Sequence, residues 1–466
     1  MNLVYGIKDK PKFGQLLIFA FQQVLAILAA TIAVPAIIGN GMSQAAALFG
    51  AGIGTLVYQL FTKFKSPVYL GSSFAFLGSM GAAFAGGVSA ALGFAGLLLG
   101  AVFAGLVYVV IAIAVKFAGV NWISKLMPPV VIGPTVAIIG MSLAGNAVGD
   151  LLKGKVGFWQ DIVTQIFKDG ELISTSDPVS TFVSTCSPYV ALICGLVTLF
   201  GVIFFSVYGK KMMKLIPFIL GILCGYVAAT IFTVIGISTN NAALQVIDFS
   251  VFKNMTIFAV PDFTFVKAFN GIKEINATYI ATIAVAYIPV AFVVFAEHIA
   301  DHKNLSSIIG QDLLEEPGLH RTLLGDGIGS MAGAFFGGCP NTTYGESVGC
   351  VAITRNASVI TITAAAFLCI IISFFGPFVT FLASIPNCVM GGVCMTLYGF
   401  IAVSGLKMIQ KVDLNASKNL FVVAVILIAG IGGLSLTFGK VTLTSIACAL
   451  ILGILVNLFV SKAKED

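Results

Sequence analysis

The chain has 466 residues, of which 58% are hydrophobic and only 9% are charged, and its mean hydropathy is +1.05. Soluble domains carry about a quarter charged residues, so the composition excludes a soluble globular protein and predicts one that crosses a membrane many times. The net charge of +6 comes from single Lys and Arg residues spread over loops. This pattern favours a role in membrane orientation and gives no reason to expect nucleic acid as a partner.

Apolar stretches long enough for a helix to cross the bilayer recur along the whole chain. We expect about fourteen, at 15–38, 43–62, 67–84, 88–115, 128–147, 187–208, 213–236, 276–300, 321–338, 342–361, 362–384, 387–405, 418–435 and 440–460. The third and tenth are weak as helices, because they are short and rich in Gly, Ser, Thr and Pro.

The distribution of basic residues predicts the orientation of these segments. With the N-terminus inside, the cytoplasmic segments hold 18 Lys and Arg residues and the external segments hold 7. Positive residues accumulate on the cytoplasmic side. We therefore expect a multi-pass protein of the cell (cytoplasmic) membrane with both termini in the cytoplasm and two long external loops, 148–186 and 237–275.

Two patterns of the first half recur in the second half in the same order. GAGIGT begins at Gly50 and GDGIGS begins at Gly325, and each precedes a broken, polar stretch; MPPVVIGP (127–134) later matches IPNCVMGG (385–392). Although these glycine motifs look like nucleotide loops, they lie in apolar helices and indicate close helix packing. Seven segments in each half would make the second copy enter the membrane from the opposite side. We therefore expect an all-α polytopic membrane protein with 14 transmembrane segments in a 7+7 inverted repeat.

The broken stretches are YLGSSFAFLGS (69–79) and GGCPNTTYGESVG (337–349), in segments 3 and 10. Non-helical backbone at membrane depth is tolerated only inside protein or along a wet cavity. Paired discontinuous segments in inverted repeats are typical of secondary transporters, whose binding site lies near the midplane between the repeats. We expect the binding site here.

Acidic side chains within the expected segments are candidates for this site, because a carboxylate in a membrane costs at least ~2.5 kcal/mol. Glu297 lies near the cytoplasmic end of segment 8, and Glu346 opens the helical half of segment 10. Glu297 could instead be an interfacial acid, and Glu346 a helix-start residue. Asp301 follows Glu297 by one helical turn, so the two could hold a proton between them. His298 and His302 lie on a neighbouring face, where histidines at a helix end are expected to be surface residues and not metal ligands.

Aromatic residues near the broken stretches could stack on a flat heteroaromatic substrate. They are Phe74 and Phe76 in the first stretch, Tyr344 in the second, and Tyr398 further on. The nine cysteines contain no C-x-x-C pair and indicate no metal or redox site. Neither a phosphate-binding loop nor a nucleophile–base arrangement is present, so we expect no enzyme, no metal and no cofactor.

Residues 295–358, which begin FAEHIADHKNLSS and include GGCPNTTYGESVG, closely resemble the signature region of the nucleobase–ascorbate transporter family (nucleobase:cation symporter family 2), and of its bacterial uracil permeases in particular. The resemblance extends to ILAATIAVP (27–35), YLGSSFAF (69–76) and MGGVCMTLYGFIAVSGLK (390–407), so it covers nearly the whole chain. It implies uracil import by proton symport through alternating access, with H⁺ as the coupling ion, and a homodimer.

The resemblance also implies a division into domains. A core domain would comprise 15–127 and 276–386, and a gate domain 128–275 and 387–461, with short cytoplasmic ends at 1–14 and 462–466. Segments 3 and 10 would each begin as a short strand, the two strands antiparallel, and continue as a half-helix.

Site residues carried over from the family complement uracil. Glu297 and Glu346 match two carboxylates that bind the pyrimidine, and Gly345 and Phe74 match positions whose backbone N–H groups meet a ring carbonyl. The apolar and aromatic contacts around the ring match Ala30, Tyr344 and Tyr398.

The chain departs from the family pattern at three places. Asp301 stands where well-studied relatives have a histidine, and His302 lies one residue away, so the proton-coupling candidates are Asp301, Glu297 and His302. Ser347 follows Glu346 where the family usually has asparagine, which puts that side chain's usual hydrogen bonding in doubt. Purine-transporting relatives often have a histidine where this chain reads Gln22–Gln23, which favours a pyrimidine.

Two alternatives remain open at this stage. One is a permease for another nucleobase, such as xanthine or urate. The other is an anion exchanger or channel on the same fold, whose site should present positive groups.

Overall fold

A computed structural model describes residues 3–119, 128–162, 165–168, 171–175, 179–210, 212–253, 255–438 and 441–461. The expected cytoplasmic C-terminus at 462–466 lies outside these residues.

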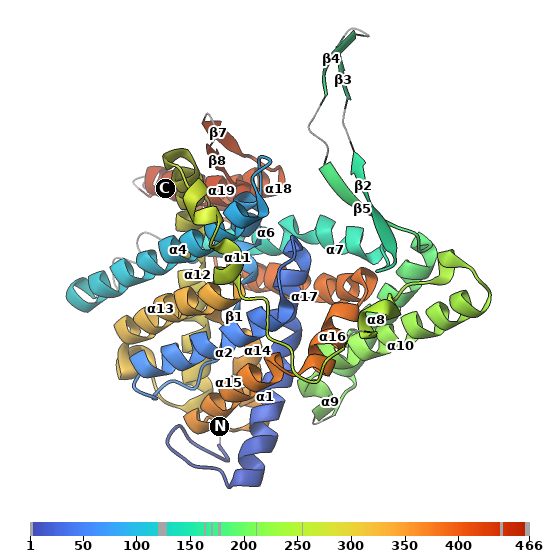
Figure 1. Cartoon of the computed structure of the whole chain (residues 1–466). Helices are drawn as coiled ribbons and strands as arrows, with labels where there is room; N and C mark the ends of the chain where they lie inside the picture. The colour runs from blue at the N-terminus through green and yellow to red at the C-terminus, as the bar shows by residue number, and fades with distance from the viewer. Residues whose placement is uncertain are drawn as a thin grey trace.

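Helices dominate the fold (Figure 1). The α-helices are α1 (Phe13–Ile38), α2 (Gln44–Phe61), α3 (Leu77–Ala83), α4 (Ala90–Ala118), α6 (Pro129–Ser142), α7 (Ala144–Leu151), α8 (Pro188–Val207), α9 (Met212–Leu215), α10 (Pro217–Ser238), α11 (Thr264–Ala268), α12 (Ala277–Ile309), α13 (Leu319–Gly337), α14 (Gly345–Thr354), α15 (Val359–Ser373), α16 (Gly376–Ser384), α17 (Asn387–Ile409), α18 (Ser417–Ile431) and α19 (Ser445–Val460). Short helical turns are η1 (Phe74–Phe76), η2 (Ala242–Leu244), η3 (Phe249–Phe252), η4 (Gly271–Glu274) and η5 (Leu314–Gly318).

Strands form four separate two-stranded antiparallel sheets among the described residues. They are β1 (Leu70–Ser72) with β6 (Asn341–Thr343), β2 (Gly157–Ile162) with β5 (Val179–Ser184), β3 (Gln165–Lys168) with β4 (Glu171–Thr175), and β7 (Leu436–Phe438) with β8 (Val441–Leu443). The β2–β5 and β3–β4 ribbons project from the helical body (Figure 1).

In the part of the chain that the structure describes, eight helical stretches are long and apolar enough to cross a membrane: α1, α2, α4, α6 with α7, α8, α10, α12 and α17. The other expected segments fall on shorter or more polar elements, so the count of fourteen stays a prediction. One boundary is wrong by more than two turns: the segment expected at 276–300 is the 33-residue helix α12, which ends only at Ile309. The polar residues after Ala300 were expected to end the helix, but they continue it, and part of them packs inside the protein.

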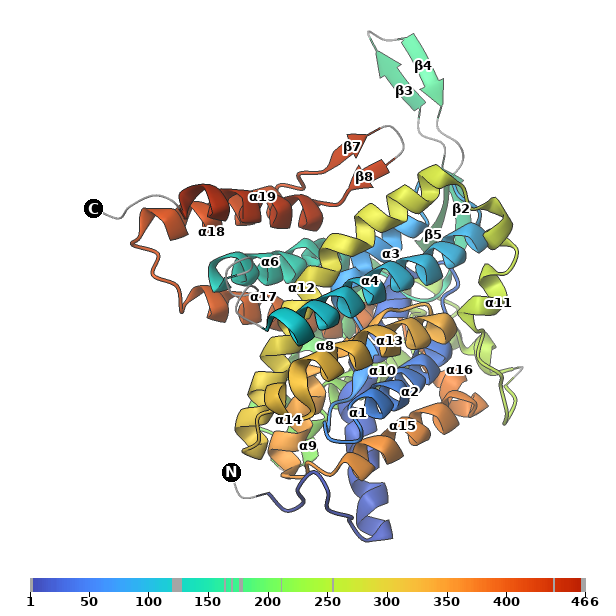
Figure 2. The ribbon, with the colours of Figure 1, turned by 90° about the vertical axis from the view of Figure 1, so that its left-hand side faces the viewer.

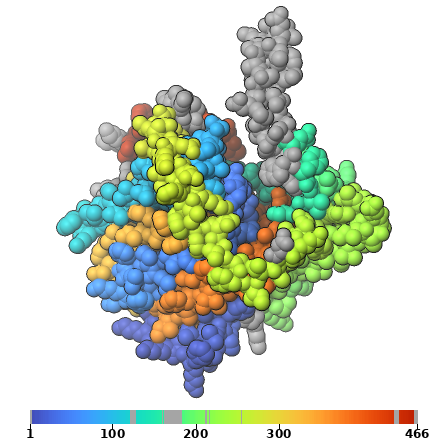
Figure 3. All heavy atoms as spheres, viewed as in Figure 1, coloured from blue at the N-terminus to red at the C-terminus, as the bar shows by residue number. Residues whose placement is uncertain are grey.

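The helices pack in two groups. In the first, α12, α4, α13, α2 and α15 each contact the next, and Figure 2 shows them stacked in that order from top to bottom. In the second, α17 packs against α6, α7 and α8, while α10 packs against α8 and α18 against α6 and α19. Helix α1 contacts both groups. Figure 3 shows α2 and α4 at one side of the surface and α8 and α10 at the other.

The glycine motifs of the two halves lie against each other, as close helix packing requires. A Cβ added to Gly54 in α2 would lie 2.7 Å from the carbonyl oxygen of Gly329 in α13 and would overlap the side-chain amide of Asn341. That amide donates to the carbonyl of Gly50 at 3.2 Å. The two helices therefore meet backbone to backbone, and their contact anchors strand β6.

The β1–β6 pair joins the two broken segments. Leu70 lies opposite Thr343 and Ser72 opposite Asn341, so residues about 270 positions apart share one ladder. The hydroxyl of Thr55 in α2 accepts from the N–H of Leu70 (3.0 Å), and its one proton is shared between the carbonyls of Ala51 (2.8 Å) and Leu70 (3.2 Å). Each strand then gives way to a short helical segment, η1 and α3 after β1, and α14 after β6.

Replacing Gly54 by Ala should destabilise the protein by about 1–3 kcal/mol, because the added methyl group overpacks the α2–α13 contact. The matched control is Gly14→Ala, since a Cβ at Gly14 meets no heavy atom within 4 Å and alanine favours the helix. Thermal melting of both purified variants in detergent measures the difference. Equal melting temperatures would contradict the close-packing interpretation.

Candidate functional site

A pocket of about 380 Å³ lies where the broken segments meet the second helix group. Its wall comes from the β1–η1 and β6–α14 segments and α12 on one side, and from α6, α10 and α17 on the other. It is lined by Ser73, Phe74, Ala75, Val136, Ile139, Phe218, Val293, Glu297, Ala300, Asp301, Thr342, Thr343, Tyr344, Gly345, Glu346, Leu397, Phe400, Ile401, Ser404 and Met408. Most of the wall is apolar, and its polar groups lie on the broken segments and α12, except for Ser404 on α17.

Three acids face this pocket and are half-buried. Glu297 and Asp301 lie one turn apart on α12, and Glu346 is in the first turn of α14. Because α12 continues past Ala300 by more than two turns, Glu297 is not at a helix end as expected but well inside the helix.

Hydrogen bonds from the second broken segment hold the pocket wall in place. Thr343 Oγ1 donates to Asp301 Oδ2 at 2.7 Å, which ties strand β6 to α12. The Tyr344 hydroxyl donates to the carbonyl of Ser72 at 2.7 Å, which ties the start of α14 to β1. Tyr344 is thereby buried, with one part of its surface lining the pocket.

Two helix starts face the same pocket. Gly345 is the first residue of α14, and Phe74 is the first residue of η1. The N–H groups of the first turn of a helix have no partner within that helix and attract polar or negative groups. The pocket therefore combines carboxylate acceptors with amide donors.

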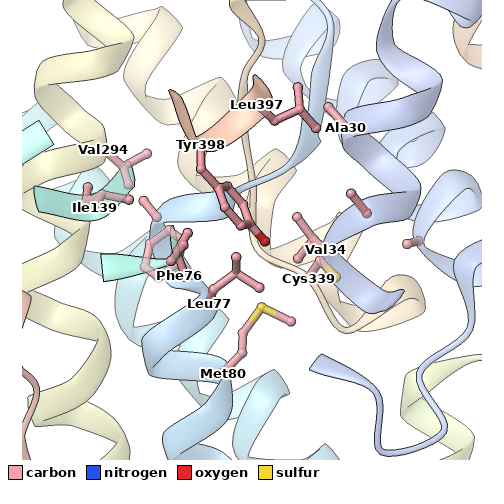
Figure 4. Packing of buried hydrophobic residues seen from close by; sticks show 14 of the residues in the cluster. Ala30, Val34, Phe76, Leu77, Met80, Ile139, Val294, Cys339, Leu397 and Tyr398 are labelled. Carbon is pink, nitrogen blue, oxygen red and sulfur yellow. The ribbon is translucent and has the colours of Figure 1, made fainter. Parts of the chain in front are cut away.

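The remaining predicted residues do not line this pocket. Ala30 and Tyr398 are buried behind its wall, and the Tyr398 ring meets the Phe74 ring edge to face at 5.9 Å. Figure 4 shows the Tyr398 side chain directed toward the space between α1, near Val34, and α3, near Leu77. His302 is turned toward Tyr58 in α2 and does not line the pocket either.

Both histidines of α12 are fully buried, so the expectation of surface residues is wrong. His302 Nδ1 donates to the carbonyl of His298 (2.8 Å), because a carbonyl can only accept. In neutral His302, Nε2 then accepts from the Tyr58 hydroxyl at 2.7 Å, and Tyr58 also pairs with Ser66 at 2.8 Å. These contacts follow from the added length of α12, which places this face against α2.

A further buried acid, Asp326 inside the GDGIGS motif, is not among the predicted site residues. Asp326 is 1% exposed in α13, and its Oδ2 lies 2.6 Å from Nδ1 of His298, while Nε2 of His298 lies 3.0 Å from the Thr322 hydroxyl. The available signal was a charged residue in the middle of a glycine-rich apolar segment. Since His298 follows Glu297 directly, this contact fixes the rotation of α12 that turns Glu297 and Asp301 to the pocket.

Two of the departures from the family pattern contact each other. The side-chain amide of Gln23 in α1 bonds to the Ser347 hydroxyl, and Nε2 also lies 3.5 Å from the Ser347 carbonyl. Ser347 is fully buried next to Glu346. Its side chain is therefore satisfied by α1, which answers the doubt about its hydrogen bonding.

Comparison with known proteins places the chain in a family. The Xan_ur_permease model, described as "Permease family", matches residues 14–439. The chain belongs to this permease family. The permease is 38% identical over 459 residues to the uracil permease of Bacillus caldolyticus (98% of this chain, 94% of that protein) and 32% identical over 451 residues to that of Escherichia coli strain K12 (96% and 92%). The resemblance to bacterial uracil permeases of the nucleobase–ascorbate family is confirmed, and the permease is a multi-pass membrane protein.

Solved structures support the fold of the permease. The transmembrane domain of the cyanobacterial bicarbonate transporter BicA matches with a TM-score of 0.58 and 16% identity, covering 98% of this chain and 100% of that one. Murine Slc26a9, an anion transporter in the inward-facing state, matches with 0.62 and 14%, covering 97% and 69%. At such identities the likeness concerns the fold alone.

Replacing Asp326 by Asn should weaken both folding and the pocket, because it removes the charged partner of buried His298. Weakening the hydrogen bond of a buried polar group in this way costs about 1–3 kcal/mol. The matched control is Asp262→Asn, whose side chain is 74% exposed and 3.5 Å from Lys267. Melting temperatures with and without ligand measure the effect. If D326N melted like D262N, the contact would not position α12.

Proposed function

We propose that this permease imports uracil by proton symport through alternating access. The observation that carries the proposal is one pocket in which two glutamates face two helix starts. Uracil presents two ring N–H donors and two carbonyl acceptors. Glu297 and Glu346 can accept from the ring N–H groups, and the amides of Gly345 and Phe74 can donate to a carbonyl, so the donors and acceptors of the ring find complementary groups.

The composition of the pocket wall suits a flat ring. Phe74 and Tyr344 provide aromatic surfaces, and Ile139 and Phe400 provide apolar ones. An aromatic face and a few placed polar groups are what small-molecule sites use for affinity and orientation respectively. The relatives named uracil permease, similar over nearly their whole length, support this substrate over xanthine or urate.

Charge argues against anion transport. The lining residues include three acids and, among the described residues of this wall, no Lys, Arg or His. An anion placed here would meet like charges at close range, which costs energy in a partly dry site. The fold shared with anion transporters therefore carries a different site in this chain.

The two helix groups support a movement of one domain against the other. We propose that the first group, with α1, is the core domain and the second is the gate domain, as the family pattern implies. The pocket lies between them, with Glu297 and Asp301 on α12 of the first group, Glu346 on α14, and Phe218, Leu397 and Phe400 on the second group. A ligand shifts such an equilibrium only if it binds the two arrangements with different affinity.

A bound proton can create a difference in substrate affinity between the two arrangements of the helix groups. Asp301 and Glu297 are one turn apart on α12, and Glu346 faces the same cavity, so three negative charges would repel one another. We propose that a proton held by Asp301 and Glu297 favours uracil binding. We further propose that both termini are cytoplasmic and that the protein is a homodimer of the cell membrane.

Glu346→Gln should reduce uracil affinity at least tenfold, because the neutral amide loses a charge-assisted hydrogen bond worth more than about 1.4 kcal/mol. The control is Glu315→Gln, an exposed acid between α12 and α13. Isothermal titration with uracil measures the constants, and xanthine and urate compete in the same assay. Unchanged affinity in E346Q would remove this residue from the site, and tighter binding of a purine would replace the substrate.

Asp301→Asn should leave uracil binding measurable but uncouple uptake from the proton gradient, because an amide cannot exchange the coupling proton. Labelled-uracil uptake into proteoliposomes, with an imposed pH gradient and with an uncoupler, tests this. The wild type should lose concentrative uptake when the uncoupler is added, whereas D301N should show only equilibrating uptake. Wild-type uptake that ignores both pH and the uncoupler would refute the symport proposal.

A further inference from the structure

A second pocket, of about 430 Å³, lies on the other side of Phe74 from the acidic pocket. The two pockets share only Phe74, Ala75 and Ile139 in their walls. Phe74 and Ala75 belong to η1, and Ile139 belongs to α6 of the second helix group, so the boundary that the two pockets share has contributions from both sides.

The second pocket extends toward the opposite side of the membrane. Its wall includes Ile37 and Ile38 at the C-terminal end of α1 and Thr444 just before α19, whereas the acidic pocket extends to Met408 near the C-terminal end of α17. With the N-terminus in the cytoplasm, α1 ends outside. The second pocket is then the first that an external substrate meets.

The polar groups of the second pocket are neutral and come from the gate side. Ser142 and Asn146 lie at the α6–α7 junction, and Thr444 and Ser445 at the start of α19. The Ser142 hydroxyl donates to the carbonyl of Ile139 (2.9 Å), and the Thr444 hydroxyl accepts from the N–H of Ala447 (3.4 Å). Both hydroxyls are thus partly used within their own helices.

Asn146 differs from these hydroxyls. Its side chain is exposed in the pocket and forms no hydrogen bond with another residue of the described part of the chain. A carboxamide carries a donor and an acceptor side by side. The imide edge of a pyrimidine, an N–H beside a carbonyl, presents the complementary pair, and asparagine binds an edge of a base with two hydrogen bonds in the same way. Phe74 offers an aromatic surface in the same cavity.

We propose that this second pocket is a separate pyrimidine site. Asn146 binds the imide edge, and the base lies next to Phe74, outside the acidic pocket. The inference rests on the proposed function, since it takes the substrate class from the acidic pocket. Binding here is weaker than in the acidic pocket, because neutral hydrogen bonds replace charge-assisted ones. At a low external concentration of substrate, this site raises the fraction of permease molecules that hold a base close to the acidic pocket. It does not contribute to proton coupling.

Binding is tested in a variant whose acidic site is weakened. Purified E346Q should retain a weak, saturable uracil signal in ligand-observed NMR, and the double variant E346Q/N146A should lose it. The matched control is E346Q/N270A, because Asn270 is an exposed asparagine outside the pocket, and it should keep the signal. 1,3-Dimethyluracil, which has no ring N–H beside its carbonyls, should give no signal in E346Q.

Transport provides the second measurement. In uptake by whole cells, Asn146→Ala should raise KM for uracil at least threefold and leave kcat within twofold, whereas N270A should match the wild type. A signal in E346Q/N146A equal to that in E346Q, or an unchanged KM, would overturn the second site. If the wild type binds uracil and E346Q gives no signal at all, the second site fails but the proposed function stands. If the wild type binds no uracil, the proposed function itself fails.

Discussion

The site depends on one constraint. Two segments of the chain leave the helical conformation inside a membrane protein, and their backbone N–H and C=O groups must still find hydrogen-bond partners. Three residues of β1 pair with three of β6, and the hydroxyl of Thr55 accepts from the N–H of Leu70. An unpaired amide in such surroundings costs several kcal/mol, so this short ladder is possible only with a partner from the other half of the chain. Once paired, both segments end in helix starts that have amides to offer. The amides that face the pocket are thus a consequence of the way in which the two broken segments satisfy their backbone groups.

The position of the acids depends in turn on contacts made behind them. Glu297 and Asp301 share α12 with His298 and His302, and the four side chains occupy two adjacent faces of one helix. The histidine face is locked against α13 and α2 by Asp326 and Tyr58. Glu297 and Asp301 can then face the pocket, because these contacts prevent α12 from rotating to expose the two acids to water. Buried polar contacts of this kind define one geometry more than they add stability.

Much of this arrangement could be predicted from residues alone. The broken stretches, the two glutamates and the glycine packing are all local signals: proline and glycine clusters, a charge in an apolar run, small residues at helical spacing. The features that could not be predicted are those that depend on how deeply a side chain is buried in the folded protein. His298 and His302 look like the polar end of a segment, and only the full length of α12 shows that they are inside the protein. Asp326 could not be singled out, because helix packing explains the glycines of its motif without any role for the acid. Tyr398 and Ala30 were carried over by resemblance, and the structure places them one layer behind the pocket.

The burial of Tyr398 has a thermodynamic consequence for any motion of the two helix groups. The residue belongs to α17, yet its ring is 2% exposed and lies against Phe74 and near α1 and α3 (Figure 4). A tyrosine buries about 150–250 Å², and returning that area to water at about 25 cal/mol per Å² costs about 4–6 kcal/mol. Separation of the groups without a replacement contact would therefore be a rare event. In the proposed movement, a flat ligand beside Phe74 would supply such a contact, so a filled permease would cross a barrier that an empty one would seldom cross, and futile leak would be limited.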